Sequence, residues 1–184
     1  MKSDPAETRL SVAIQARTLE IELFWKRSFF FWGFIASAFV GYGVMIDKAP
    51  SVTVVVAGFG FVCSVAWTLA NRGSKFWQEN WETKVERAEQ ETIGDVFRTQ
   101  ESRQAKGWFS AHRYSVSRLV IALSDYSIFA WAVLEVHATQ RAIGLTNIAS
   151  HYKTAFVLTY VIATLAYTIF VLFTCRSQRE TPYS

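Results

Sequence analysis

Cysteine and histidine are scarce in this chain, and their scarcity excludes several kinds of site. There are two cysteines and three histidines in 184 residues. Cys63 lies inside one apolar stretch and Cys175 at the end of another, so their predicted depths in a membrane oppose a disulfide. The chain has no C-x-x-C, no H-E-x-x-H, no nucleophile elbow and no glycine-rich loop. We therefore expect no catalytic residue, no resident metal and no cofactor, and a protein that is not an enzyme.

Positive charge is sparse in two connections between apolar stretches. Four stretches are long enough to cross a hydrocarbon core as helices: Ser28–Ile46, Val52–Ala70, Val116–Val136 and Thr154–Cys175. Only three of the nineteen Lys and Arg residues (Lys48, Arg141 and Lys153) fall in the connections joining the first to the second and the third to the fourth. By the positive-inside rule, the N-terminus, the middle segment and the C-terminus are predicted to be cytoplasmic.

The soluble part carries almost no net charge, which argues against a nucleic-acid partner. Residues 71–115 hold eight Lys or Arg and seven Asp or Glu, although the whole chain has a net charge of +4. The excess positive charge flanks the spans, where it sets topology and contacts anionic lipid headgroups. No small-x-small cleavage pattern follows the first apolar stretch, so we expect it to remain as an uncleaved span.

These patterns predict an all-α membrane protein with four transmembrane helices arranged as two hairpins. The predicted segments are a cytoplasmic amphipathic helix (1–27), hairpin 1 (28–70), a cytoplasmic helical insert (71–115), hairpin 2 (116–175) and a cytoplasmic tail (176–184).

The N-terminal segment has the pattern of a capped helix. Asp4 can cap it and Pro5 suits the first helical position. Two neighbouring apolar stripes follow at helical spacing: Val12, Ala16, Leu19 and Leu23 in one, and Leu10, Ile14 and Ile21 in the other. The alternation over residues 19–23 also fits a strand, but capping and length favour a helix.

The insert is predicted to begin at a helix break. The string Asn71-Arg72-Gly73-Ser74 is typical of a helix end or kink, with Ser74 capping a new helix. That amphipathic helix is interrupted at Gly94, a second short helix is expected over Val96–Ala105, and the insert is expected to pack on the N-terminal helix.

Small residues recur every fourth position in the first two spans. They are Gly33, Ser37 and Gly41 in the first span and Gly60, Ser64 and Thr68 in the second. Such stripes let helix backbones approach closely in lipid. Close packing within the hairpin and contact between subunits are both compatible with the pattern.

Asp125 is the acidic residue at the centre of a predicted span. A carboxylate there costs about 2.5–3.5 kcal/mol on insertion scales, so it should face protein, water or a partner. Ser124 is its neighbour, and Tyr160 and Tyr167 are candidate hydrogen-bond partners from the fourth span. Two interpretations stay open: a proton- or cation-handling carboxylate beside a pore or cavity, and a neutral aspartic acid that joins helices.

A metal site near the external surface is a weaker hypothesis. Glu135, His137 and His151 could meet there, but two of them flank a connecting loop and nothing in the sequence fixes their geometry. We do not predict a metal from them.

The most distinctive string follows the first hairpin. Its candidate assembly residues are Trp77, Gln78, Glu79, Asn80, Trp81 and Glu82. Two tryptophans one turn apart suit a subunit contact or an ordinary interfacial anchor. Together with the four-span layout, the string Asn71–Glu82 resembles the RipA family of bacterial octameric membrane proteins. The resemblance implies a homo-oligomeric ring in the bacterial cytoplasmic membrane and implies no catalytic residue.

Two functional hypotheses follow. In the first, the ring is channel-like and Asp125 lies near a pore or cavity. In the second, the ring is a non-conducting scaffold that recruits a cytoplasmic protein through residues 74–106. The lipid bilayer and further copies of the chain are the expected partners in both.

Overall fold

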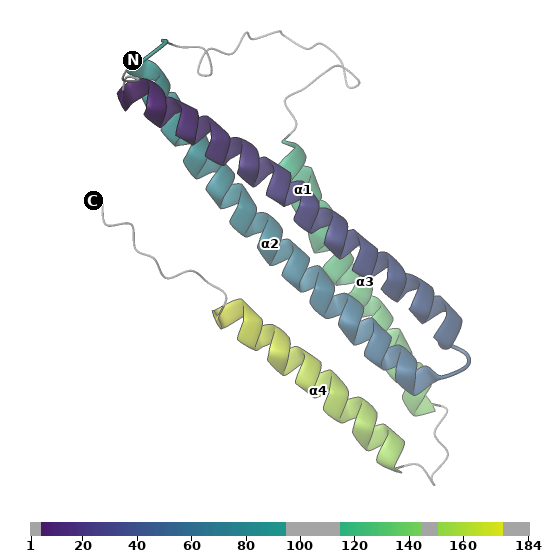
Figure 1. Ribbon diagram of the computed structural model, residues 1–184. Coiled ribbons are helices and arrows are strands. Elements are labelled where there is room, and N and C mark those ends of the chain that lie inside the picture. The colour runs from purple at the N-terminus through teal and green to yellow at the C-terminus, as the bar shows by residue number, and fades with distance from the viewer. Residues whose placement is uncertain (1–4, 95–114, 145–150, 175–184) are drawn as a thin grey trace, which may run out of the picture. The chain divides into compact units, whose positions relative to one another are not determined.

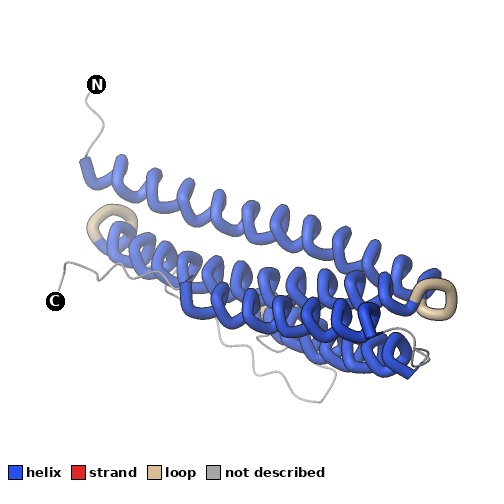
Figure 2. The backbone as a smooth tube through the Cα atoms, turned by 90° about the horizontal axis from the view of Figure 1, so that it is seen from below, coloured by secondary structure: helices blue, strands red, loops and turns tan. Residues whose placement is uncertain are grey.

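The structure, a computed structural model, describes residues 5–94, 115–144 and 151–174. The predicted short helix over Val96–Ala105, the whole cytoplasmic tail and Cys175 lie outside the described residues. All the described elements are helices joined by turns, and Figure 2 draws no strand among them. The predicted all-α class is confirmed.

Four helices make up the described chain: α1 (Pro5–Met45), α2 (Pro50–Gln90), α3 (Val116–Gly144) and α4 (His151–Thr174). Each contains an apolar window long enough to cross a membrane. In lipid the backbone polar groups must bond within the segment, which a helix achieves through its own sequence-local hydrogen bonds. The predicted four spans are confirmed.

The connection between α1 and α2 is as short as predicted. The amides of Lys48 and Ala49 donate to the carbonyl of Met45, at 3.1 and 2.8 Å, and α2 begins at Pro50. Proline suits this position because its missing N–H has no intrahelical partner in the first turn. Pro5 occupies the same position in α1, as the sequence predicts.

The break predicted at residues 71–74 is wrong. α2 continues through Asn71, Gly73 and Ser74 to Gln90. Gly73 does not adopt a positive φ, and the Ser74 side chain is buried against α1 instead of capping a new helix. The interruption predicted at Gly94 is confirmed, since its φ is 82° and the amides of Ile93 and Gly94 turn back to the carbonyl of Glu89.

The described chain divides into two compact units, and α1 and α2 contribute to both. Unit 1 comprises Met1–Phe31 and Trp67–Ser124. In this unit the N-terminal half of α1 lies beside the C-terminal half of α2 (Figure 1). Leu10 and Ala13 pack on Val85, with Ile14 and Ala88 against them. The predicted packing of the insert on the N-terminal helix is confirmed, and it uses the stripe that contains Leu10 and Ile14.

Unit 2 comprises Trp32–Ala66 and Asp125–Ser184. It joins the C-terminal half of α1 and the N-terminal half of α2 with most of α3 and with α4. Its buried apolar residues come from all four helices: Ile35, Ala38, Tyr42, Val54, Ala57, Trp131, Ala138 and Val157. Glycines allow close approach here, because a Cβ at Gly60 would lie 2.4 Å from the Trp131 ring.

Candidate functional site

The four residues predicted as an intramembrane polar site have different environments. Asp125 is half-buried in α3. Ser124 is fully buried in unit 1, where its hydroxyl donates to the carbonyl of Ile121 at 2.8 Å. In unit 2 the hydroxyl of Tyr160 donates to the carbonyl of Val55 at 3.0 Å, whereas Tyr167 is 55% exposed. The site hypothesis for Asp125 stays a prediction.

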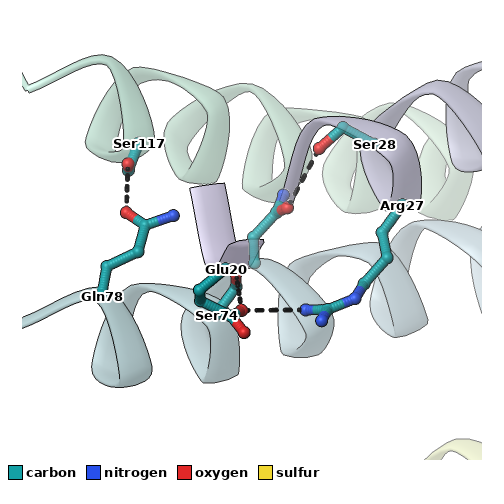
Figure 3. Close-up of polar contacts among 7 residues, drawn as sticks. Glu20, Arg27, Ser28, Ser74, Gln78 and Ser117 are labelled. Carbon is teal, nitrogen blue, oxygen red and sulfur yellow. Dashed lines mark hydrogen bonds and ion pairs between the residues drawn. The ribbon is translucent and has the colours of Figure 1, made fainter. Parts of the chain in front are cut away.

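A ladder of polar side chains runs through unit 1, and sequence reasoning missed it (Figure 3). Its members on α2 are Trp67, Asn71, Ser74 and Gln78, which follow one another at steps of four, three and four residues. This spacing places them on one face of the helix. The same spacing was the available signal, but the Gly73-Ser74 pair was interpreted as a helix end.

At the centre of the polar ladder, Asn71 links α1 to α3. Its side-chain oxygen accepts from Ser28 at 3.4 Å, and its Nδ2 donates to Ser124 at 3.3 Å. The indole N–H of Trp67 also donates to Ser28, at 3.4 Å. Because all these side chains are buried, their hydrogen bonds replace those that water would supply.

Further along α2, at Ser74, the polar ladder includes the carboxylate of Glu20 from α1. Glu20 accepts from Ser74 at 2.5 Å and from Arg27 at 3.2 Å. One helical turn further, Ser117 donates to the buried Gln78 at 2.9 Å. The polar ladder thus ties α1, α2 and the start of α3 together, and its chemistry is that of a satisfied structural network.

The predicted assembly residues of α2 divide between the inside and the outside of unit 1. Gln78 is part of the polar ladder, Glu79 pairs with Lys75 at 3.2 Å, and Glu82 pairs with Arg17 at 3.7 Å. Asn80 and Trp81 are half-buried.

Trp77 projects outward from the same helix. It is 46% exposed and packs edge-on against Phe76, which is 62% exposed, with the two ring centroids 5.6 Å apart. We call these two side chains the aromatic pair. Of the two, Trp77 is a predicted assembly residue, and Phe76 immediately precedes the predicted set.

A groove of about 410 Å³ also lies in unit 1, between the N-terminal half of α1 and the C-terminal half of α2. Its lining combines cations with an apolar floor: Thr8, Arg9, Val12, Ala13, Trp81, Lys84, Arg87, Ala88 and Glu91. The ammonium of Lys84 lies 4.2 Å from the centroid of the Trp81 ring, which is the geometry of a cation–π contact.

In unit 2, some residues of the small-residue stripes pack against other helices and others face outward. A Cβ at Gly41 would contact Val56 at 3.5 Å, so Gly41 packs within the hairpin. A Cβ at Gly33 would meet no atom within 4 Å, and Ser37 is exposed with its hydroxyl bonded to the carbonyl of Gly33. In the second stripe, Ser64 shares a 2.8 Å hydrogen bond with Ser127 of α3.

The three residues of the metal hypothesis do not form a cluster among the described residues. His137 Nδ1 lies 2.7 Å from the hydroxyl of Tyr42, with which it forms a hydrogen bond. The part of the chain that the structure describes contains no group of three His, Cys, Asp or Glu side chains placed to hold a metal ion. The carboxylate oxygens of Glu135 are buried in unit 2.

Comparison with models of known protein families gives a match over most of the chain. The model of a family described as "Octameric membrane protein family (8xMP)" matches residues 7–140, which is more than half of the chain. Searches of curated proteins and of solved structures gave no significant match.

Proposed function

The chain belongs to the octameric membrane protein family, and from this membership we propose that its ring of subunits acts as a non-conducting membrane scaffold. Family membership and the four apolar helices make it a self-associating, multi-pass membrane protein. The scaffold role is the second hypothesis from the sequence. It needs subunit and lipid contacts along the spans and a protein-binding surface outside the membrane.

One observation carries the proposal: many of the exposed large side chains of the spans are aliphatic or phenylalanine, while many of the polar side chains are bonded inside the units. Ser28 and Asn71 in unit 1 and Ser64 and Ser127 in unit 2 are all buried and paired. The exposed side chains include Phe30, Phe34, Val40, Phe129, Ile162, Leu165, Phe170 and Phe173. Such surfaces suit lipid and neighbouring helices, whereas a water-filled pore needs polar lining.

The competing proposal is a channel-like ring with Asp125 near a pore or cavity. The observation that favours it is a carboxylate within the apolar part of α3, next to Ser124. Intramembrane acids commonly mark ion or proton pathways.

Several narrower features belong to the same proposal. We propose a bacterial cytoplasmic membrane as the location and cytoplasmic N- and C-termini, on the distribution of Lys and Arg around the spans. The RipA resemblance and the absence of enzymatic activity stay predictions. The proposed recruiting surface, residues 74–106, is described as far as Gly94, and it contains the aromatic pair of Phe76 and Trp77.

The scaffold is tested by measuring assembly and ion flux on the same purified protein. Oligomer mass in nanodiscs is compared with proton and potassium flux into liposomes. We expect octamers whose flux does not exceed that of protein-free liposomes, and an Asp125→Asn variant with the same mass. Trp77→Ala should lower the octamer fraction, while the control Ile93→Ala, which removes an exposed apolar side chain just beyond α2, should not.

The opposite result identifies a conduit. Flux through the unmodified protein that disappears in an octameric Asp125→Asn variant would replace the scaffold with the channel-like proposal. If instead Asp125→Asn prevents assembly, its carboxylate joins helices, which removes the main residue of the channel-like proposal.

A further inference from the structure

The groove in unit 1 has an open apolar floor between two helices. The floor is formed by Val12 and Ala13 of α1 and by Trp81 and Ala88 of α2, and the groove has a volume of about 410 Å³. Val12 is 55% exposed and Trp81 is half-buried, so unit 1 itself leaves this floor uncovered. An apolar groove between two helices suits a third helix that lays its apolar face into it.

The rim of the groove carries an excess of positive charge. It holds three cations and one carboxylate: Arg9, Lys84, Arg87 and Glu91. The carboxylate of Glu91 lies 3.8 Å from Arg9, so it offsets that cation, whereas Lys84 and Arg87 are exposed on the other wall. The rim therefore favours a partner with negative charge beside its apolar face.

The groove lies beyond the reach of lipid headgroups. Trp81 lies about 16 Å along α2 from Ala70, the predicted end of the second span, at 1.5 Å per residue. On α1, Ala13 lies about 22 Å before Ser28, the predicted start of the first span. The headgroup region adds only about 5–8 Å to each side of the hydrocarbon core. The partner is therefore a soluble protein and not a bilayer lipid.

The segments of this chain outside the described residues have the wrong charge for the rim. Residues 95–114 hold four Lys or Arg and two Asp or Glu, and residues 175–184 hold two Arg and one Glu. Both segments are net positive, so the excess cations of the groove repel them.

A second copy of the chain is also a poorer match. The acids of α2 outside the groove form a row at Glu79, Glu82 and Glu86. Glu79 and Glu82 already pair with Lys75 and Arg17. The row contains no apolar side chain that could lie on the floor of the groove.

We propose that the groove binds an acidic amphipathic helix of a soluble partner protein. Apolar residues at positions i, i+3 or i+4, and i+7 of that helix lie between Val12 and Trp81, and its flanking carboxylates contact Lys84 and Arg87. The α2 wall runs from Trp81 to Glu91, about 15 Å, which accommodates the two turns between such anchors. The inference rests on the scaffold proposal and deepens it, because it names the class of protein that the scaffold recruits.

The test is binding of a synthetic peptide to octamers in phosphatidylcholine nanodiscs, measured by fluorescence anisotropy against empty nanodiscs. The labelled peptide is an amphipathic helix of about 15 residues, with leucine on one face and glutamate beside it. The controls are the same peptide with lysine in place of glutamate and a peptide of the same composition in scrambled order. We expect saturable binding of the acidic amphipathic peptide, at least tenfold tighter than that of either control.

Two matched pairs of variants locate the binding site. Val12→Asp places a carboxylate on the floor and should weaken binding at least tenfold. Leu19→Asp should leave binding unchanged, because Leu19 is also 55% exposed on α1 but lies outside the groove. Lys84→Gln should weaken binding at least threefold, whereas Lys26→Gln, which removes an exposed cation elsewhere on α1, should not.

The proposal is overturned if non-conducting octamers show no saturable binding of the acidic peptide, or if Val12→Asp and Leu19→Asp bind it equally. It is also overturned if binding appears only after the octamer dissociates, since a neighbouring copy then covers the groove. Equally tight binding of the anionic lipid dodecanoate would make the groove a lipid site and would overturn it as well. A conducting ring that still binds the peptide would overturn the scaffold proposal alone, so the two failures are distinguishable.

Discussion

A Cβ atom on Gly60 of α2 would lie 2.4 Å from the indole ring of Trp131 on α3, which is closer than two non-bonded carbon atoms can approach. The ring is fully buried and also packs on Phe39, with centroids 4.4 Å apart, so it has little room to move. We predict that Gly60→Ala destabilises the protein by about 1–3 kcal/mol through overpacking. Thermal unfolding in detergent measures the change.

Gly33→Ala is the matched control for this substitution. It is also a glycine of a small-residue stripe, but a Cβ there meets nothing within 4 Å inside the chain. In a helix interior, alanine is favoured over glycine by about 0.5–1 kcal/mol. Equal destabilisation by both variants would contradict the role assigned to Trp131.

The polar ladder predicts a large effect at Asn71. Asn71→Ala removes the buried hydrogen bonds to Ser28 and Ser124, each of which keeps one other hydrogen bond, to Trp67 and to the carbonyl of Ile121. We expect a loss of about 1–3 kcal/mol in the free energy of unfolding. Gln90→Ala, at the exposed end of α2, should change it little. The two variants are compared by denaturant titration, and a similar shift in both would rule out a stabilising role for the ladder.

Two carboxylates on α1 should differ sharply in their contribution. The Glu20 side chain is 14% exposed and accepts from Ser74 and Arg27, whereas Glu22 is largely exposed and lies 3.8 Å from Lys26. Glu20→Ala should cost about 1.5–3 kcal/mol, the range for hydrogen bonds to charged groups. Glu22→Ala should cost about 0.3–0.5 kcal/mol. The unfolding midpoints of the two variants are compared. A larger loss of stability in Glu22→Ala than in Glu20→Ala would contradict the structural role given to the Glu20 carboxylate.

Tyr160 and Tyr167, two of the three tyrosines of α4, allow a similar comparison inside the membrane-spanning part. Tyr160→Phe removes the hydrogen bond to the carbonyl of Val55, and hydrogen bonds of this kind contribute about 0.6 kcal/mol on average in a membrane protein. Tyr167→Phe alters an exposed side chain and should have a smaller effect. Resistance to unfolding by a denaturing detergent ranks the variants. Loss of stability only in Tyr167→Phe would contradict the observed placement.

Much of the fold could be predicted from local sequence. Apolar length predicted the four spans, Pro5 predicted the start of α1, and Gly94 predicted the interruption of the amphipathic helix that follows the first hairpin. The error at residues 71–74 came from the same kind of evidence. Gly73 and Ser74 favour a helix end locally, but the partners that make a continuous helix stable there, Ser28 and Glu20, lie far away in the sequence.

The candidate sites were less predictable. Asp125 stood out because it is an acid within an apolar run. Glu135 lies one residue before the predicted end of the third span at Val136, whereas α3 continues to Gly144. The groove in unit 1 includes Val12 and Trp81 from two different helices, and no sequence spacing on either helix could have shown it.

Local sequence was sufficient to predict the helical class and the number of spans, because apolar length and the need to bond every backbone amide in lipid act within one segment. Membership of the octameric membrane protein family agrees with that architecture. Tertiary packing was needed to show which polar side chains are satisfied and that the Glu135 carboxylate is buried. Those properties depend on side chains from different helices, and the packing of helices brings them together.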